Sequence, residues 1–294
     1  MRKACPKSIL KEVKSGLGAR NIRVTGTAEG YNNNIYFINA DGRQLALKVT
    51  KSDRLKIHNE VFALRKWHAL GVPVPEIVLA DRRNRYCVET RMPGMPLGRA
   101  HLTGAQTAKV MAELGRHIRK MHSVKMKRFG YLDRNGIGTK SSWERFVSPD
   151  FNGCMKAMRE KEVVRYDEMR RIDRFHERYK PLINLRQGRL VHSDLTLDNI
   201  MVKDGRLSGI IDASDAMSGD PEFDLAYTYA ALYPKVGPFM SLVRGYGGVD
   251  MRKVRLYFVW IVLYWIIKDV DDKRSRKYFR RNLRRLRHFM VHET

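Results

Sequence analysis

The sequence predicts an α+β fold of two unequal lobes, and three observations support this prediction. The first ninety residues alternate short apolar segments with turn residues, as strands do, around one segment of helical periodicity. The segment Pro93-Gly94-Met95-Pro96 then interrupts the chain, which is typical of a boundary between lobes. Apolar residues at helical spacing dominate the remainder. We therefore expect an N-terminal lobe, a small antiparallel sheet with one helix, over residues 1–92, and a larger helical lobe over residues 93–294.

The composition indicates a globular chain in a reducing compartment. Of the 294 residues, 43% are hydrophobic, which is too many for a disordered chain. The three cysteines, Cys5, Cys87 and Cys154, are scattered, and this argues against a disulfide framework or a zinc site. No signal peptide is evident, and the longest apolar run, Leu256–Ile267, is shorter than the ~20 residues that span a bilayer. These features predict a cytoplasmic protein with no transmembrane segment.

The N-terminal strands surround a polar loop. Expected strands cover residues 22–24, 35–38 and 44–49, and Asp41-Gly42 is a favourable hairpin turn because both residues tolerate positive φ. The loop over residues 25–34 contains Gly26, Gly30 and an asparagine-rich tip that includes Asn33. Glycine and amide groups of this kind can approach phosphates, but the loop lacks a complete GxGxxG, and an ordinary hairpin loop is the alternative.

Helical periodicity begins after these strands. Ile57, Val61, Leu64 and Trp67 form one apolar stripe, and Gly71 with Pro73 ends the helix. A strand is expected over residues 85–92, and further helices over residues 103–122, 151–179, 223–232 and 252–270.

The charge of the chain is strongly positive, with a net charge of +26 and a pI of about 10.2. Between Met251 and Thr294 there are thirteen Lys or Arg against four Asp or Glu. Phe279, Leu283, Leu286 and Met290 recur at helical spacing within this segment. We expect a basic amphipathic C-terminal helix, either a docked helix with a solvated face or a site for a polyanion such as RNA or an anionic membrane surface.

The segment that carries the chemistry is Val191-His192-Ser193-Asp194-Leu195-Thr196-Leu197-Asp198-Asn199-Ile200, which joins two short strands. Asp212 follows another apolar strand over residues 207–211. Two carboxylates and an amide on adjacent loops suit phosphoryl transfer: Asp194 accepts the proton of the attacking hydroxyl, and Asn199 and Asp212 hold Mg²⁺. The alternative is a polar hairpin tip without chemistry.

These residues also resemble a known family. His-x-Asp-x-x-x-x-Asn followed by Ile-Ile-Asp is similar to the catalytic and metal-binding loops of the protein-kinase-like fold. The next segment, Gly219-Asp220-Pro221-Glu222-Phe223-Asp224-Leu225-Ala226, resembles the aminoglycoside phosphotransferase family of small-molecule kinases. The resemblance implies a bilobal protein-kinase-like fold. It also implies Mg²⁺- and ATP-dependent transfer of the γ-phosphoryl group to a hydroxyl of a small molecule. The acceptor that the resemblance implies first is an aminoglycoside or a related antibiotic.

The resemblance further assigns roles to residues outside these loops. Lys48 would reach the nucleotide phosphates, and Glu60 would pair with it. Asp220 and Asp224 would accept backbone N–H groups of the catalytic loop. The nucleotide would lie beneath Gly26, Gly30 and Asn33 and against the backbone of Glu89, Thr90 and Arg91.

Several departures leave the substrate open. Ser193 stands where the small-molecule kinases usually have Gly, and the seven residues 213–219 are too few for an activation segment. Aminoglycosides are polycations, so an acidic pocket is expected, and the candidates are Asp150, Glu222, Asp269, Asp271, Asp272 and the C-terminal carboxylate. The high positive charge favours an alternative, a RIO/Bud32-like atypical kinase that works beside RNA. A sugar or lipid-headgroup kinase at an anionic surface and a nucleic-acid-binding pseudokinase are further alternatives.

Overall fold

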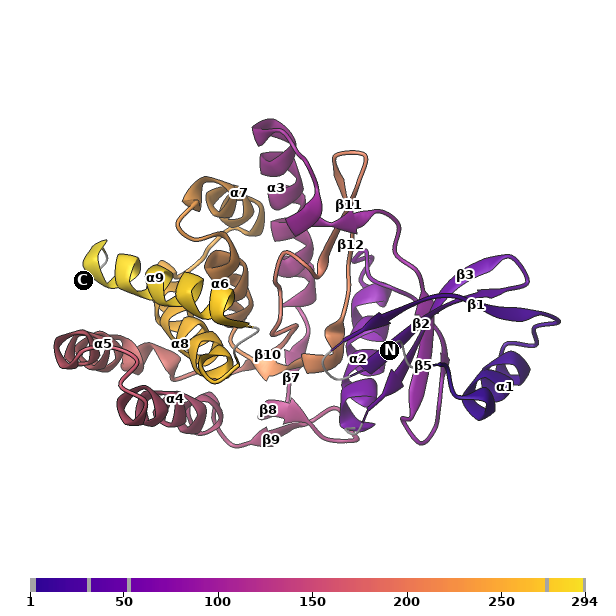
Figure 1. The fold of residues 1–294 in the computed structure, drawn as a ribbon, viewed down its shortest axis with the longest axis horizontal. Helices are drawn as coiled ribbons and strands as arrows, with labels where there is room; N and C mark the ends of the chain where they lie inside the picture. Colours follow the sequence, from indigo (N-terminus) through magenta and orange to yellow (C-terminus); the bar gives the residue numbers. More distant parts are fainter. Residues whose placement is uncertain (1–3, 31–32, 52–53, 273–274, 293–294) are drawn as a thin grey trace.

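The computed structural model describes residues 4–30, 33–51, 54–272 and 275–292. Two unequal parts are visible in Figure 1: a sheet at the N-terminal end, and a larger helical part at the other. Tyr31 and Asn32 of the expected glycine loop, and the C-terminal carboxylate, lie outside the described residues. In the described part of the chain, no helix has the length and apolar character needed to cross a membrane.

The N-terminal part is a five-stranded antiparallel sheet with the order β1-β2-β3-β5-β4. Its strands are β1 (Ile22–Glu29), β2 (Asn33–Ala40), β3 (Arg43–Thr50), β4 (Ile77–Ala80) and β5 (Tyr86–Thr90).

Two helices pack against this sheet, α1 (Lys7–Gly16) and α2 (Arg54–Ala69), where the sequence predicted only one. In α1, Ile9 and Val13 are buried in the core that contains Tyr36 and Leu47, while the rest of the helix is largely polar. A helix of ten residues is marginal on its own, and packing of this apolar stripe against the sheet stabilises it.

The chain leaves the sheet after Thr90 and enters the helical part through β6 (Met95–Pro96), which pairs with β11 (Ile200–Lys203). Gly94 has φ of 95°, and a Cβ at this position would lie 2.1 Å from the carbonyl oxygen of Val202. A glycine is therefore required where the connecting segment crosses β11. The domain boundary at residue 92 stays a prediction.

The remaining elements are helices and short strands. The helices are α3 (Gly104–Met121), α4 (Trp143–Glu160), α5 (Tyr166–Tyr179), α6 (Pro221–Leu232), α7 (Val236–Tyr246), α8 (Met251–Val270) and α9 (Arg276–His292), with 3₁₀ turns η1 (Leu97–Arg99), η2 (Lys180–Ile183) and η3 (Ala213–Asp215). The strands are β7 (Lys125–Met126), β8 (Phe129–Leu132), β9 (Gly138–Lys140), β10 (Gly188–Val191), β12 (Arg206–Ile210) and β13 (Met217–Gly219).

The helix α8 occupies the centre of the helical part, and ten of its residues are buried. It packs against α6, α9 and α4, as Figure 1 shows. The expected helix over residues 151–179 is in fact two helices, α4 and α5, separated at residues 161–165, and α7 was not predicted.

The helix α2 joins the two parts. Its residues Ala63, Leu64 and Trp67 belong to the large core of the helical part, and the Trp67 ring stacks on His192 with centroids 6.0 Å apart. A helix of the N-terminal part is thus fixed directly to the loop that carries Asp194.

Candidate active site

The catalytic loop lies between β10 and β11, and its two key residues contact each other. The Asn199 side-chain amide donates to the carbonyl oxygen of Asp194 at 2.9 Å and to its Oδ2 at 2.8 Å. Burial, together with the nearby carboxylates of Asp212 and Asp215, raises the pKa of Asp194 to about 7. A carboxyl group with this pKa can exchange a proton near neutral pH, which a general base requires.

Buried hydrogen bonds hold this loop in place. Fully buried Asp224 accepts from the backbone N–H groups of His192 (2.7 Å) and Ser193 (2.5 Å), and it contacts Nε2 of His122 at 3.0 Å. The contact expected for Asp224 is therefore present. The same expectation was wrong for Asp220, which instead accepts from Glu222 N–H at the start of α6, from Tyr257 OH (2.7 Å) and from Lys253 (3.1 Å). Its position as the residue before Pro221 favours this helix-capping role.

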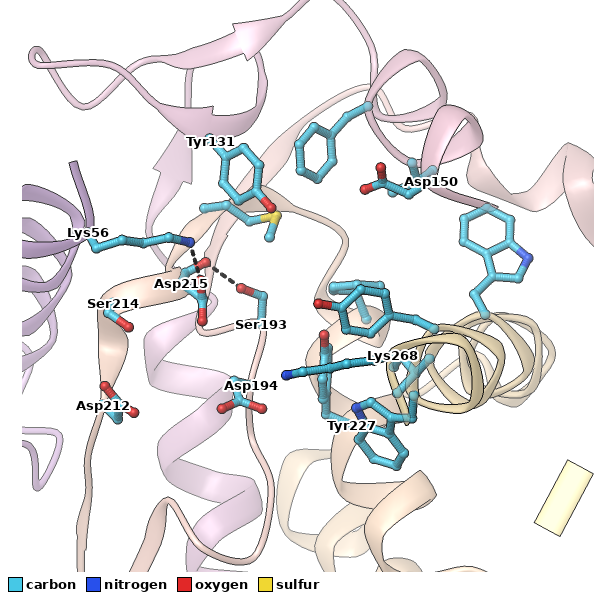
Figure 2. A pocket seen from close by; sticks show the side chains of 18 of the residues that line it. Lys56, Tyr131, Asp150, Ser193, Asp194, Asp212, Ser214, Asp215, Tyr227 and Lys268 are labelled. Carbon is cyan, nitrogen blue, oxygen red and sulfur yellow. Dashed lines mark hydrogen bonds and ion pairs between the residues drawn. The ribbon is translucent and has the colours of Figure 1, made fainter. Parts of the chain in front are cut away.

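Asp212 comes directly after β12 and has a strained backbone. Its φ of 65° lies in the left-handed region, which is uncommon for a residue with a Cβ and is typical of functional sites. The side chain is 40% exposed and lines the same cavity as Asp194. Figure 2 shows the two carboxylates on separate segments in the lower part of the view.

The oxygen donors of this site fit a magnesium ion. Mg²⁺ prefers one or two protein carboxylate or amide oxygens and takes its other ligands from water and phosphates. The Asn199 amide nitrogen is bound to Asp194, so the amide oxygen is the atom available to a metal, as is the carboxylate of Asp212.

Lys48 lies in a buried ionic cluster. Its Nζ pairs with Glu60 of α2, as expected, and also lies 3.2 Å from Glu89 and 3.7 Å from Asp212. Burial raises the pKa of Glu60 to about 8 and raises that of Glu89, whereas the pKa of Lys48 is above its usual value. Lys48 is therefore charged, and burial shifts both glutamates towards their protonated form.

The expected contact of a nucleotide with the backbone of Glu89, Thr90 and Arg91 stays a prediction. The Thr90 N–H donates to Glu76 O at 2.9 Å and the Arg91 N–H donates to Gln44 O at 3.4 Å, so sheet hydrogen bonds already occupy both donors. The side chain of Glu89 instead points to Lys48, a contact that the sequence did not suggest.

The glycine loop is shorter than expected, since β1 continues to Glu29 and β2 begins at Asn33. Gly26 lies within β1 at an irregularity in its pairing, beside the ring of Phe37. The Gly30 N–H donates to Asn33 O at 3.0 Å, and both residues line the cavity. Gly30 and Asn33 thus lie near Asp194 and Asp212, whereas Gly26 lies further along the strand.

A cavity of about 440 Å³ opens above the catalytic loop (Figure 2). Two lysines line it, Lys56 and Lys268, and Lys56 pairs with Asp215. Of the proposed acidic candidates that the structure describes, only Asp150 lines this cavity. Glu222 lies beside Lys253, and Asp271 pairs with Lys161.

Aromatic side chains form much of the cavity surface. We call the set contributed by α6 and α8 the aromatic wall: it consists of Phe223, Tyr227, Trp260, Tyr264 and Trp265. Phe146 and Phe151 of α4 extend it. From the sequence, residues 252–270 were expected to form a helix, with no role in a cavity. The spacing of Trp260, Tyr264 and Lys268, four residues apart, is the signal that these side chains share one face.

The chain is similar to known phosphotransferases. Residues 23–257 match the sequence model of the phosphotransferase enzyme family. The chain is 22% identical over 209 residues to hygromycin-B 4-O-kinase of Escherichia coli, covering 68% of this chain and 59% of that protein. The chain thus spans about three-fifths of the length of this curated relative.

Solved structures show the same fold. A thermostable mutant of aminoglycoside phosphotransferase APH(4)-Ia, in a ternary complex with ADP and hygromycin B, superposes with a TM-score of 0.70 at 17% identity, covering 97% of this chain and 98% of the other. The streptomycin and ATP complex of APH(2")-IIa gives 0.67 at 16% identity, with 98% and 99% covered. The bilobal protein-kinase-like fold is therefore confirmed.

Proposed function

Because the chain belongs to the phosphotransferase enzyme family, we propose that it transfers the γ-phosphoryl group of ATP to a hydroxyl group of a small molecule. The observation that carries this proposal is that Asp194 and Asp212 line one cavity of a size suited to a small ligand, with Asn199 hydrogen-bonded to Asp194. An aminoglycoside or a related antibiotic is the first class of acceptor to test, because the curated relative is a hygromycin-B kinase.

In the proposed reaction, the acceptor hydroxyl oxygen forms a bond to the γ-phosphorus, and the bond from that phosphorus to the bridging oxygen of ADP breaks. The leaving electron pair stays on ADP, and the hydroxyl proton passes to the Asp194 carboxylate. Asp194 orients the hydroxyl and, with a pKa near 7, exists partly as the carboxylate at neutral pH.

The remaining residues position the nucleotide. Asn199 and Asp212 would hold Mg²⁺, which when bound neutralises charge on the phosphates. Lys48, oriented by Glu60 and Glu89, would contact the phosphates as a point charge. Gly30 and Asn33, at the cavity edge, would lie over them.

The test is ATP consumption with a panel of hydroxylated compounds, including hygromycin B, kanamycin, amino sugars and amino alcohols. We expect turnover with at least one compound, loss of turnover in Asp194→Asn, and retained Mg-ATP binding in that variant. Asp212→Asn should lose Mg²⁺-dependent nucleotide binding. The control is Asp198→Asn, since Asp198 is an exposed carboxylate of the same loop. Full activity in Asp194→Asn would contradict the proposal.

A polyanion partner for α9 stays a prediction, and so does a cytoplasmic location. The helix contains no acidic residue, and its exposed face carries Arg276, Lys277, Arg280, Arg281 and Arg284. Arg285 and Arg287 are instead engaged with Tyr233 and Glu168. Replacing Arg280, Arg281 and Arg284 with Gln should therefore reduce the salt dependence of RNA binding, whereas Arg287→Gln should not.

A further inference from the structure

We infer that the acceptor carries an apolar ring system and a single amine, and is not a polycation made of amino sugars alone. This inference rests on the proposed function, because it concerns the acceptor of the same cavity. It comes from the charges and the aromatic side chains that line the cavity, which point to different chemistry from that of a polyamine site.

Most carboxylates of the cavity already have a proposed catalytic role or an ion-pair partner. Asp194 and Asp212 belong to the proposed transfer chemistry, and Asp215 pairs with Lys56. Asp150 remains, and no ion pair that involves it is found among the described residues. Figure 2 shows Asp150 on α4, well separated from Asp212. An acceptor with one amine would find one partner there, whereas several ammonium groups would lose their hydration without compensation.

The cavity also contains a cation beside the catalytic base. Figure 2 shows Lys268, on α8, with its ammonium group directed towards Asp194. A positively charged group of the acceptor bound at Asp194 would lie close to this ammonium group, and like charges repel each other. The part of the acceptor that presents the hydroxyl is therefore expected to be uncharged.

The aromatic wall favours an apolar group of the acceptor, whereas Lys268 disfavours a cationic one. Trp260 is 7% exposed and Phe151 is 6% exposed, so these rings are held rigidly by the core. Tyr264 and Tyr131 at the rim are 49% and 45% exposed. When an apolar ligand covers half-exposed rings on a concave surface, apolar area is removed from water and the free energy of binding becomes more favourable. The face of such a ring can also stabilise an amine.

The experiment compares ligands that present the same sugar hydroxyls on different aglycones. Methyl, phenyl and 4-(aminomethyl)phenyl β-glucosides, with kanamycin, are titrated against Asp194→Asn while tryptophan fluorescence is recorded, since Trp260 and Trp265 line the cavity. We expect phenyl glucoside to bind at least tenfold more tightly than methyl glucoside, and the aminomethyl compound more tightly again. Equal binding of the methyl and phenyl compounds, or tighter binding of kanamycin than of the aminomethyl compound, would overturn the inference.

Two variants locate the effect. Tyr264→Ala should reduce the phenyl-to-methyl affinity ratio at least threefold, whereas Tyr278→Ala should leave it unchanged. Tyr278 is a matched control because it is 50% exposed and lies on α9, outside the cavity. Asp150→Asn should remove the advantage of the aminomethyl group, and an advantage that persists in this variant would overturn the part of the inference that concerns Asp150.

Phosphoryl transfer to the same compounds by the unmodified protein separates the two proposals. Transfer to kanamycin with no preference for the aryl glucosides would retain the proposed function and overturn the inference. The expected binding order without transfer to any compound would overturn the proposed function and retain the preference of the cavity.

Discussion

Replacing Asp194 with Asn should abolish phosphoryl transfer and, at the same time, stabilise the metal-free protein. Burial and two neighbouring carboxylates raise the pKa of Asp194 from 3.8 to about 7. A carboxyl group whose pKa is higher in the folded state destabilises that state wherever the group is ionised. The destabilisation begins as pH rises through the unfolded value of 3.8, increases up to about 7, and is constant above that pH.

The size of the effect follows from the pKa. The difference of about three pH units corresponds to about 4 kcal/mol at 25 °C, because a tenfold change in an equilibrium constant is ~1.4 kcal/mol. Solvent at the cavity mouth screens the charge, so we expect a gain of about 1–4 kcal/mol in the free energy of unfolding at pH 8. At pH 5 the gain should be about one-third of that value.

The assay is urea unfolding in the presence of a metal chelator, at pH 5 and pH 8, for the unmodified protein, Asp194→Asn and Asp198→Asn. The Asn side chain keeps an oxygen that can accept the hydrogen bond from Asn199. Asp198→Asn, at the exposed position in the same loop, should change stability little at either pH. An Asp194→Asn variant that is no more stable than the unmodified protein at pH 8, or a gain that is equal at both pH values, would refute the reasoning.

Three further predictions concern the catalytic loop and the packing of α3. Because Asp194 acts as a base only when it is ionised, kcat/KM should rise with pH through a midpoint near 7. Asp215→Asn should move this midpoint to lower pH, because it removes a negatively charged neighbour of Asp194. An unchanged pH profile in the variant would contradict this cause. Asp224→Asn should lower kcat, and it should lower the free energy of unfolding by about 2–4 kcal/mol. The cause is that an amide N–H₂ would face the two backbone N–H groups that now donate hydrogen bonds to Asp224. Kinetics measures the first effect and urea unfolding the second. Gly115→Ala should lower the free energy of unfolding by about 2 kcal/mol, since its Cβ would lie 2.2 Å from a carbonyl oxygen of α7. The control is Gly104→Ala on the same helix, where the added Cβ meets open space. This control should be neutral or slightly stabilising in the same urea titration.

The catalytic loop was predictable because its residues are adjacent in the sequence. Asp194 and Asn199 lie five positions apart on one loop, so their contact needs no knowledge of the rest of the fold. The pair of Lys48 and Glu60 followed from a strand and the next helix, although only the family resemblance pointed to it.

The contact of Glu89 with Lys48 was not predictable, since it depends on strand register. Lys48 pairs with Cys87 and Ala46 pairs with Glu89, and this places the side chains of Lys48 and Glu89 on the same face of the sheet. A shift of one residue would have turned Glu89 to the other face, and the sequence does not specify this register.

The residues that line the cavity could not be predicted from the sequence, for a different reason. The helix α8 is apolar on all sides, so its periodicity does not reveal which stripe faces the core and which faces the cavity. Tyr264 and Lys268 are identified as cavity residues only when α4, α6 and the catalytic loop are placed around α8.

The attachment of α2 has a consequence for how such a protein is controlled in a cell. Trp67 stacks on His192, and Lys56 pairs with Asp215, so the helix that carries Glu60 is fixed at both of its ends to the part of the chain that contains the catalytic loop. Moving this helix outwards to switch the protein off would break a buried ring contact and an ion pair together. We expect a protein that is assembled for catalysis as soon as it folds, so that its output is adjusted through synthesis and degradation and through the supply of its substrates.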